Sequence, residues 1–589
     1  MDDARRAAEI DPITLEIIGH GLVAIPNEID ANITRTAFSP LVYEYKDFAS
    51  GLVDAEGRLV AQGSGSIPIF VANALGVAVR DGIAVHGIDN IHDGDVLISN
   101  HAGTLGQHLN NVVMYTPVFA APGELFGFMC VLVHWIDVGG STVGSCSATD
   151  ATEIFQEGIQ FRSVKLWSKG VRNDDLYRIV EINTRFPTMV LGDLGSQLAG
   201  TLTGKRMFLA LIERYGAATM RAAIDAIWDR SERVARNGVR DLPDGVWRAE
   251  SFLDNDGIDG DVPVPVAVEV RIAGETMTVD LSGVGGVLRG PLNSGTYGGA
   301  WPAARIAFKI LTAPDEPANE GCFRPLEIVV PDGTFLSAPA TAPMGMYSAT
   351  LPTVIDTIVR AVGEADPARA AGGHHGTFAA HWFFGTDPAT GALYQQLDTG
   401  HGGWGATADG DGSGPYKTMA HGDTLDVPVE VQEALCPLLV ETIALRPDSA
   451  GDGTHRGGLG TEKVVRVLSE SGFSIQIDRT RCRPWGIDGG TEGAGADGTI
   501  EPAEGEPRRL LKGVTALEPG DRFRLRTGGG GGFGPPEARD PERVAADVAA
   551  GYVSRGKAET VYRVALDRDG AVDRAATRRL RREGPGVAR

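Results

Sequence analysis

The chain has 589 residues, of which 42% are hydrophobic and 22% charged, so it has enough apolar material for a large buried core. Its net charge of −23 argues against a nucleic-acid-binding protein, which would need a basic face. We find no apolar run near the roughly 18 residues needed to span a bilayer, and no signal-peptide pattern at the N-terminus. We therefore expect a cytoplasmic protein without a membrane or nucleic-acid partner.

The cysteines and the basic C-terminus carry further expectations. The five cysteines are scattered, which argues against a disulfide framework and against a Cys-type zinc site; they are Cys130, Cys146, Cys322, Cys436 and Cys482. The last residues read "RAATRRLRREGPGVAR". We expect them to form a solvated, partly disordered end rather than a binding arm.

The N-terminal third is predicted to begin with a helix and continue with strands. Asp11 and Pro12 are typical of an N-cap and a first helical position, and Pro26 is expected to kink or interrupt the helix. The stretch "FASGLVDAEGRLVAQ" predicts a hairpin with a turn at "DAEG". The apolar runs "DVLISN", "NVVMYTPVF" and "LFGFMCVLVHWIDV" predict buried strands.

The remainder alternates between helical and strand patterns. Residues 193–240 predict two helices broken near Gly216, and strand patterns return from about residue 245. Asp540 and Pro541 mark the start of a late helix. We predict an α+β protein: a large mixed fold, rich in β-strands, with a central helical hairpin. Its expected parts are residues 1–190 (α/β, with the candidate site), 191–243 (the hairpin), 244–425 (mixed α/β), 426–565 (β-rich, ending in a helix) and 566–589 (the basic tail).

Two glycine-containing stretches resemble ligand loops only superficially. The acidic turn at residues 254–261 has Pro265 where a calcium loop needs its bidentate Glu. The run "RTGGGGGFGPP" at 526–536 lacks the Lys-Ser/Thr ending of a nucleotide-binding P-loop. We expect a tight crossing of glycine backbone there instead.

The turn "NHAGTLGQHLNN" at residues 100–111 is the strongest candidate site. It lies between two predicted strands, and if those strands are neighbours, His108 and His134 face each other at one end of the sheet. Asp47, just before the predicted hairpin, adds a carboxylate. One Asp and two His are a common ligand set for Zn or Mn. The spacing alone also fits satisfied polar residues in a loop.

Several stretches together carry a family resemblance. They are "DPITLEIIGHGL", "TRTAFSPLVYEYKDFASGLVDAEGRLVAQ", "DVGGSTVGSCSATDATEIFQEGI", "NEGCFRPLEIVVPDGTFL", "ALRPDSAGDGTHRGGLG" and "TGGGGGFGPPEARDPERVAADVAAGYVS". With them the chain resembles the hydantoinase B/oxoprolinase family from about residue 10 to 565. The resemblance implies a hydantoinase B-like fold and a hetero-oligomer with a hydantoinase A-type subunit that binds ATP and Mg. That subunit phosphorylates the substrate, and the B-type chain completes the reaction with a divalent metal.

The resemblance also implies a ligand set. Asp47, His108 and His134 match the family's Asp and two His, whereas Asn111 stands where the family has an Asp. A neutral amide removes a charge and weakens affinity for Zn or Mn. His101 is new at its position, and it is a candidate replacement ligand or acid/base group, or a solvent-facing histidine.

Other candidate residues accompany this set. Asp137 is expected either to orient His134 or to cap the "DVGG" turn. Asp150, Glu153 or Glu157 is a candidate general base, with Glu153 preferred, although helix capping explains them nearly as well. Cys322 is expected to be structural. We expect the substrate pocket to be lined by His374, His375 and His381, with Trp382 and Phe383 beside them.

The leading functional hypothesis is the metal-containing subunit of an ATP-dependent cyclic amide hydrolase that opens hydantoin, oxoproline or lactam rings. The first alternative is a subunit of an ATP-dependent ketone carboxylase acting on a substrate such as acetone or acetophenone. The second is a non-catalytic scaffold whose metal site has decayed, with Asn111 as the trace.

Overall fold

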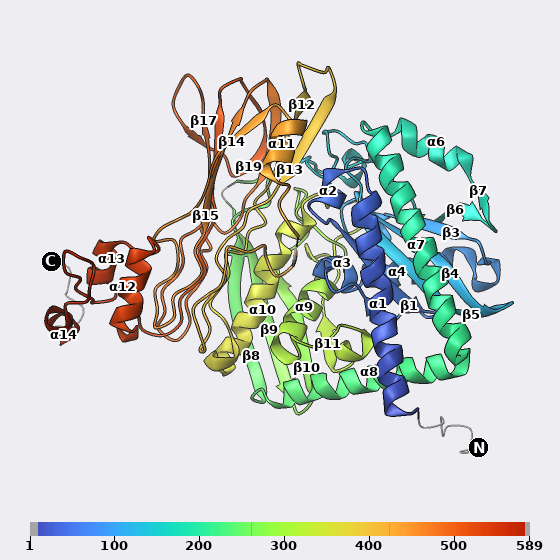
Figure 1. Cartoon of the computed structure of the whole chain (residues 1–589), viewed down its shortest axis with the longest axis horizontal. Coiled ribbons are helices and arrows are strands. Elements are labelled where there is room, and N and C mark those ends of the chain that lie inside the picture. Colours follow the sequence, from blue (N-terminus) through green and yellow to red (C-terminus); the bar gives the residue numbers. More distant parts are fainter. Residues whose placement is uncertain (1–9, 261, 423, 583–589) are drawn as a thin grey trace. The chain divides into compact units, whose positions relative to one another are not determined.

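The structure is a computed structural model that describes residues 10–260, 262–422 and 424–582. It divides into two compact units. Unit 1 comprises Met1–Val246, Arg271–Leu351 and Met419–Pro428, and unit 2 comprises Trp247–Val270, Pro352–Thr418 and Val429–Arg589. Both contain helices and sheets (Figure 1), which confirms the predicted α+β class. The five-part division of the chain stays a prediction.

Unit 1 contains most of the long helices. Its helices are α1 (Pro12–Thr36), α2 (Pro40–Tyr43), α3 (Pro68–Val71), α4 (Ala74–His86), α5 (Ala102–Leu105), α6 (Asp174–Ile182), α7 (Pro187–Tyr215), α8 (Ala217–Arg240) and α9 (Ala300–Thr312). Its strands are β1 (Phe48–Asp54), β2 (Leu59–Gln62), β3 (Val96–Ser99), β4 (Asn111–Ala121), β5 (Glu124–His134), β6 (Val164–Ser168), β7 (Val171–Arg172), β10 (Thr276–Val284) and β11 (Leu326–Val329). The two helices predicted for the middle of the chain are α7 and α8, which are broken at Gly216 as expected. They form a corner rather than the predicted hairpin, because α8 turns away from α7 (Figure 1).

The first helix starts as predicted but passes through its proline. The Asp11 carboxylate accepts the Thr14 N–H, which caps α1. Pro26 lies inside α1, and the helix continues to Thr36, so the predicted interruption is wrong. The apolar face around Pro26 is buried, and its packing offsets the hydrogen bond that the proline removes; this face consists of Ile18, Leu22, Ile25, Ile29 and Ile33.

The seven-stranded sheet of unit 1 positions the candidate site. Its order is β2-β1-β5-β4-β3-β6-β7, and the predicted hairpin β1–β2 and the buried strands β3, β4 and β5 are all confirmed. Helices cover both faces. Gly204 of α7 lies against Met129, and Gly82 of α4 lies against Tyr115. Tyr115 pairs with Cys130, which follows Met129 in β5. Because successive side chains of a strand point to opposite faces, the two helices contact opposite faces of the sheet.

One segment of unit 1 is apolar and long enough to span a membrane by composition. It is Pro68–His86, which covers α3 and α4. In the structure 67% of this segment is buried within the protein, as in a core helix. The segment also includes Arg80 and Asp81.

Unit 2 is built mainly from strands. Its helices are α10 (Leu351–Ala365), α11 (Val429–Leu435), α12 (Pro541–Ala549), α13 (Arg555–Thr560) and α14 (Arg574–Arg582). Its strands are β12 (Ala380–Thr386), β13 (Leu393–Asp398), β14 (Leu438–Leu445), β15 (Thr461–Val467), β16 (Ser471–Gln476), β17 (Asp497–Glu501), β18 (Arg508–Arg509), β19 (Lys512–Leu517) and β20 (Arg522–Arg526). The unit boundaries fall within β8 (Gly245–Leu253) and β9 (Val264–Ala273).

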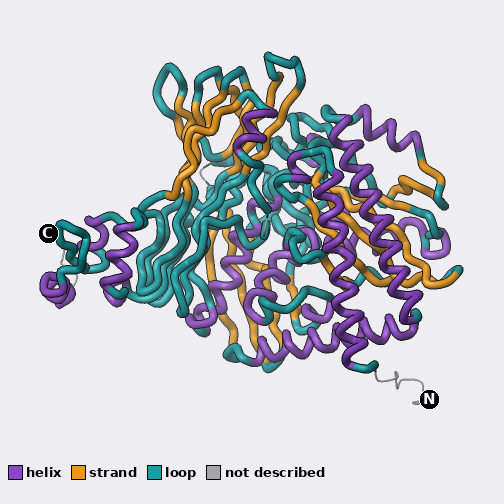
Figure 2. Tube along the Cα trace, in the orientation of Figure 1, coloured by secondary structure: helices purple, strands orange, loops and turns teal. Residues whose placement is uncertain are grey.

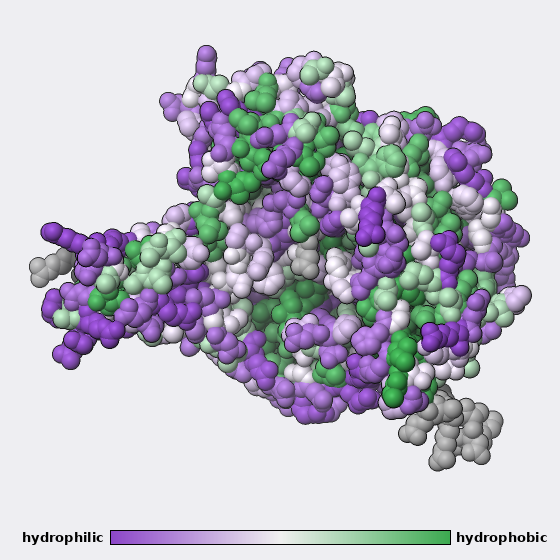
Figure 3. Space-filling model, in the orientation of Figure 1, coloured by the Kyte–Doolittle hydropathy of each residue, from purple (hydrophilic) through white to green (hydrophobic). Residues whose placement is uncertain are grey.

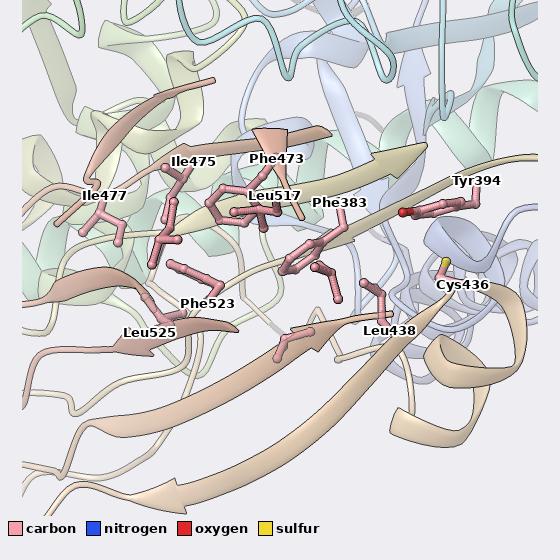
Figure 4. Close-up of a cluster of buried hydrophobic side chains, with 14 of the residues drawn as sticks. Phe383, Tyr394, Cys436, Leu438, Phe473, Ile475, Ile477, Leu517, Phe523 and Leu525 are labelled. Carbon is pink, nitrogen blue, oxygen red and sulfur yellow. The ribbon is translucent and has the colours of Figure 1, made fainter. Parts of the chain in front are cut away.

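The core of unit 2 lies between two sheets of order β13-β12-β16-β19 and β14-β15-β20-β17-β18. Aromatic and aliphatic side chains from both sheets meet there (Figure 4). Phe383, Phe473 and Phe523 form its centre, with ring centroids 4.7 to 4.9 Å apart for the pairs that include Phe473. This apolar layer is the principal stabilising contact between the two sheets.

Beside these strands, long glycine-rich runs lie next to one another (Figure 2). A Cβ atom at Gly530 would lie 1.9 Å from the Trp404 carbonyl oxygen, and one at Gly405 would lie 1.7 Å from the Gly372 carbonyl oxygen. The runs also exchange backbone hydrogen bonds, such as Gly530 N–H to Gly458 C=O at 2.9 Å. The run at 526–536 is therefore the predicted tight crossing of glycine backbone.

The C-terminal helices end the described chain. Asp540 caps α12 and Pro541 is its first residue, as predicted. Residues 574–582 form α14, so the expected disorder of the basic tail is wrong for this segment; residues 583–589 lie outside the described residues. Asp573 accepts the Ala575 and Ala576 N–H groups and Thr577 is buried, which anchors the helix. Figure 3 shows mainly hydrophilic side chains over α12–α14.

Candidate metal centre

Three strand ends bring the candidate ligands to one end of the seven-stranded sheet. Asp47 immediately precedes β1, Asn111 is the first residue of β4, and His134 is the last residue of β5. In the antiparallel register Asn111 pairs with His134, and the His134 N–H donates to the Asp47 C=O at 3.0 Å. The turn after α5 adds His108, whose ring centroid lies 4.8 Å from that of His134. The predicted meeting of the two histidines is confirmed.

His108 has more acceptors around it than it has protons. Its Nδ1 lies 3.1 Å from the Gly345 carbonyl oxygen, and its Nε2 lies 2.9 Å from Asn111 Oδ1. The Asn111 amide is held in this orientation because its Nδ2 donates to Gln107 Oε1 and to Tyr347 Oη. Burial lowers the pKa of His108 to about 4, so the ring is neutral and has one N–H for two oxygens.

This shortage of hydrogen-bond donors shows whether a cation would fit between the side chains. When Nδ1–H donates to Gly345, the lone pair of His108 Nε2 faces the lone pairs of Asn111 Oδ1. His134 shows the same kind of mismatch, because its buried Nδ1 has no hydrogen-bond partner among the described residues. Buried polar atoms are otherwise almost always paired. Nitrogen and amide-oxygen donors that converge without protons fit a divalent cation.

Cys146 lies beside the two histidines. It was not among the ligands predicted from the sequence. Its Sγ lies 3.7 Å from His134 Nε2, and one ligand atom from each of His108, His134 and Cys146 lies within 4.8 Å of the others. The Cys146 N–H donates to Asn110 Oδ1, which fixes the loop beside the turn. The cysteine spacing gave no signal, because a single Cys completes the cluster through a loop that folds back onto the strand end.

Two buried carboxyl groups complete the surroundings. Burial raises the pKa of Asp47 to about 7, and it raises the pKa of Glu157 to about 8. One oxygen of Glu157 accepts the Met344 and Gly345 N–H groups, and the other has no hydrogen-bond partner among the described residues. Burial first, and then the charges of Glu157 and Asp47, raise the pKa of the Cys146 thiol. These three groups therefore share one low-dielectric environment.

The other predicted catalytic residues lie in different settings. The Asp137 carboxylate accepts the Gly144 and Arg185 N–H groups and pairs with the Arg185 guanidinium at 2.9 Å, which matches the turn-capping alternative. The exposed Glu153 is the N-cap of a 3₁₀ turn and forms a capping box with Gln156. Of the acidic residues considered in this loop, Glu157 and not Glu153 has a side chain buried beside the histidines.

His101 lies at the other end of the same turn, beside a pocket. It precedes α5, and its Nδ1 lies 3.0 Å from Thr104 Oγ1. Helix α5 lines a pocket of about 590 Å³, whose walls include Ala102, Gly103, Thr104, Tyr297, Ser337 and Pro339. Gly106 then adopts a left-handed conformation (φ +67°) against the Gly295 backbone, where a Cβ atom would clash. This glycine lets the turn pass from the pocket wall to His108.

The three histidines predicted to line a substrate pocket belong to unit 2. His374 Nδ1 lies 3.0 Å from Asp356 Oδ1, and the His374 and His375 ring centroids are 5.6 Å apart. Both nitrogens of the buried His375 have no hydrogen-bond partner among the described residues. His381 lies in the aromatic core, with its ring centroid 5.1 Å from that of Phe523. Their role in substrate binding stays a prediction.

Comparisons with known proteins agree over nearly the full chain. The family model described as hydantoinase B/oxoprolinase matches residues 11–536. A protein of Pseudomonas sp. (strain NS671), named as the B-type subunit of a D-/L-hydantoinase, is 30% identical over 98% of both chains. The crystal structure of an ATP-dependent caprolactamase from Pseudomonas jessenii matches with a TM-score of 0.89 and 27% identity, over 98% of this chain and 100% of that chain. An acetone carboxylase structure shares the fold, with a TM-score of 0.88 and 20% identity, over 98% of this chain and 83% of that one.

Proposed function

The chain belongs to the hydantoinase B/oxoprolinase family, and on that premise we propose that it is the metal-containing subunit of an ATP-dependent enzyme that opens cyclic amide rings. The observation that carries the proposal is the buried cluster of His108, His134 and Cys146, with Asp47 and Asn111 at the same sheet end. The likeness to a caprolactamase over the full chain supports the choice of cyclic amides as the substrate class.

ATP binding is assigned to a partner chain. The glycine run at 526–536 is packed against other backbone segments, as at Gly530 and Trp404, so its N–H groups do not form an open phosphate cradle. The relative from Pseudomonas sp. is named as one subunit of its enzyme. A hydantoinase A-type subunit that binds ATP with Mg would supply an activated, phosphorylated substrate, and the two chains would form a hetero-oligomer.

The residues that would hold the cation are His108, His134, Asp47 and Asn111. Their donor atoms are two imidazole nitrogens, a carboxylate and an amide oxygen, which suit Zn or Mn. A divalent cation held there would supply Lewis acidity toward a carbonyl or phosphoryl oxygen. Asn111 contributes no charge, so the ligand set has one carboxylate where the family pattern has two.

The side chains around the cluster would handle the protons. Ring opening needs a proton on the departing amide nitrogen. Glu157 is protonated at neutral pH, because burial raises its pKa to about 8, and its free oxygen lies in the same buried environment as Cys146. We therefore propose Glu157 as the acid, and we prefer it to the exposed Glu153, the earlier candidate general base. His101 immediately precedes α5, whose residues line the pocket, and it stays the candidate acid/base group of this turn.

The experiment that tests this function uses the assembled complex with its ATP-binding partner. ATP hydrolysis and ring opening would be measured on hydantoin, 5-oxoproline and caprolactam, with the parent chain, His108→Ala, and Asp175→Asn as a control on the exposed helix α6. We expect ring opening without bicarbonate by the parent and by Asp175→Asn, and a loss of at least a hundredfold in His108→Ala. ATP turnover that requires bicarbonate and a ketone would instead establish the carboxylase alternative.

The same assay decides on the scaffold alternative. A scaffold would bind the partner but leave its ATP turnover unchanged when His108 is replaced. Equal turnover by the parent and His108→Ala complexes, across all the substrates, would contradict the proposed function.

A further inference from the structure

We propose that Cys146 is a ligand of the cation at this site, and that its thiolate supplies the negative charge that Asn111 does not. The inference rests on the proposed metal centre and specifies how this chain builds it. It also predicts the class of metal: a site with two imidazoles and one thiolate favours Zn over Mn, because sulfur is a soft ligand.

The position of Cys146 supports this role. Its Sγ is buried and faces His134 Nε2 at 3.7 Å, and it forms no disulfide. The loop that carries it is held at several points: Ser145 Oγ accepts the Val138 N–H at 2.8 Å and donates to the Gly139 C=O at 2.7 Å, and the Cys146 N–H donates to Asn110 Oδ1. The sulfur is thus fixed against the histidines by the backbone on both sides of the loop.

The backbone before Cys146 is in an unfavourable conformation. Ser145 has a φ of +61°, a left-handed value that non-glycine residues rarely adopt. Such strain persists where the surrounding contacts enforce it, and it is concentrated at functional sites. Here the strained residue directly precedes the thiol, which turns Cys146 toward the histidines.

Charge balance gives a second argument. The imidazoles of His108 and His134 bind a cation in their neutral form and Asn111 is an amide, so Asp47 is the only carboxylate among the four ligands carried over from the family pattern. A dication with one carboxylate leaves a net positive charge in a buried site, and burying an unbalanced charge is strongly unfavourable. The Cys146 thiolate brings the set to neutrality. On binding, the thiol proton is released to solvent and the S–H bond is replaced by a sulfur–metal bond.

Among the described residues the converging ligand atoms belong to His108, His134 and Cys146 and not to Glu157, so Glu157 does not replace Cys146 as this ligand. One of its oxygens accepts the Met344 and Gly345 N–H groups at 2.6 and 2.7 Å. Those two bonds hold the segment whose Gly345 carbonyl faces His108 Nδ1. Glu157 therefore positions His108, whereas the sulfur of Cys146 is directed at His134.

The test is the optical spectrum of the full-length chain loaded with Co(II), together with its metal content. We expect the parent to show an intense thiolate-to-cobalt charge-transfer band in the near ultraviolet, and Cys146→Ser to lose that band and bind Co(II) and Zn at least tenfold more weakly. Cys322→Ser is the matched control, because Cys322 is equally buried in unit 1 but lies against the Pro317 carbonyl, and it should retain the band.

A double variant keeps the test decisive if Cys146→Ser folds poorly. Asn111→Asp combined with Cys146→Ser restores the charge with oxygen, so we expect it to bind metal again, without the charge-transfer band and with an increased preference for Mn over Zn. Cobalt that binds to the parent without the band would overturn the role of Cys146 and leave the metal centre standing. A parent that binds no cobalt, zinc or manganese would overturn the metal centre itself, and with it this inference.

Discussion

Two buried polar clusters in this protein differ in how completely their hydrogen-bonding groups are matched. In unit 2, Arg539 is almost fully buried and bonds to Asp411 and Asp547, with its Nη atoms 2.6 and 2.8 Å from their carboxylates. In unit 1, His108, His134 and Glu157 are equally buried, yet each keeps an atom without a suitable partner. Matched charges stabilise a fold, whereas unmatched polar atoms mark a place where a ligand completes the structure.

The largest expected effect comes from breaking the matched cluster. Arg539→Met leaves two carboxylates without their buried partner, and we expect the free energy of unfolding to fall by about 3–5 kcal/mol. The control is Arg543→Ala, because Arg543 also pairs with Asp411 but is half exposed; its expected effect is below about 1 kcal/mol. Denaturant unfolding followed by circular dichroism measures both. Similar losses in the two variants would show that burial does not set the strength of these pairs.

A second prediction concerns an incompletely matched carboxyl away from the metal centre. The buried Asp193 accepts the Phe38 and Ser39 N–H groups with one oxygen, while the other oxygen has no partner among the described residues, and burial raises its pKa to about 6. Between about pH 4 and pH 6 the unfolded chain loses this proton while the folded chain retains it. The free energy of unfolding therefore falls as pH rises through this range, and above pH 6 the total loss is about 3 kcal/mol.

Asp193→Asn removes this titration and retains an oxygen for the two N–H groups. The stability of the variant relative to the parent should thus improve between pH 4.5 and 7.5, measured as the difference in Tm at each pH. The exposed Asp175→Asn variant should show no such trend. A constant difference for Asp193→Asn would contradict the assigned pKa direction.

A third prediction concerns the effect of a bound cation on the stability of the unmatched cluster in unit 1. If a cation completes the unmatched cluster, it stabilises the folded state by about 2.7 kcal/mol when its free concentration is 100 times Kd. Chelation should therefore lower the Tm of the parent chain and leave that of His108→Ala unchanged. Differential scanning calorimetry with and without a chelator measures this. If the chelator leaves the Tm of the parent unchanged, the histidine cluster does not hold a stabilising cation and is an ordinary part of the core.

The smallest expected effect concerns the glycine runs of unit 2. Gly530→Ala places a Cβ atom against the Trp404 carbonyl, and we expect a loss of about 1–3 kcal/mol in unfolding free energy. Gly410→Ala is the control, because a Cβ atom there would meet nothing within 4 Å. Equal stability of the two variants would show that the packed glycine runs can separate without loss.

Much of unit 1 could be predicted from its sequence, because its signals are local. Asp11 and Pro12 predict the start of α1, the turn at "DAEG" predicts the hairpin β1–β2, and continuous apolar, β-branched runs predict β3 to β5. The polar turn predicts where His108 meets His134. The expected interruption at Pro26 is wrong because the packing of a whole apolar face outweighs the local preference of proline. Cys146 could not be predicted for a different reason. Its position depends on a loop that returns to the end of the sheet, and no periodic pattern in the sequence indicates the course of that loop.

The sequence was enough to predict the ligand types of the candidate site, but not whether their hydrogen-bond donors and acceptors are paired. The sequence shows two histidines, an Asp and an Asn, whereas only the structure shows that one neutral ring faces two oxygens. Glu153 was a candidate general base with helix capping as the alternative explanation, and the structure shows the capping box at the surface while Glu157 turns inward. Whether an acidic residue faces the interior depends on tertiary contacts such as the Met344 and Gly345 N–H groups, which lie far away in sequence.

The most direct test of the metal centre is the metal content of the purified chain, measured by elemental mass spectrometry for the parent and for His108→Ala. We expect about one equivalent of a divalent transition metal, chiefly Zn, in the parent and a loss of most of it in His108→Ala. A parent that is purified and reconstituted without retaining any metal, or a His108→Ala variant that retains a full equivalent, would contradict this expectation.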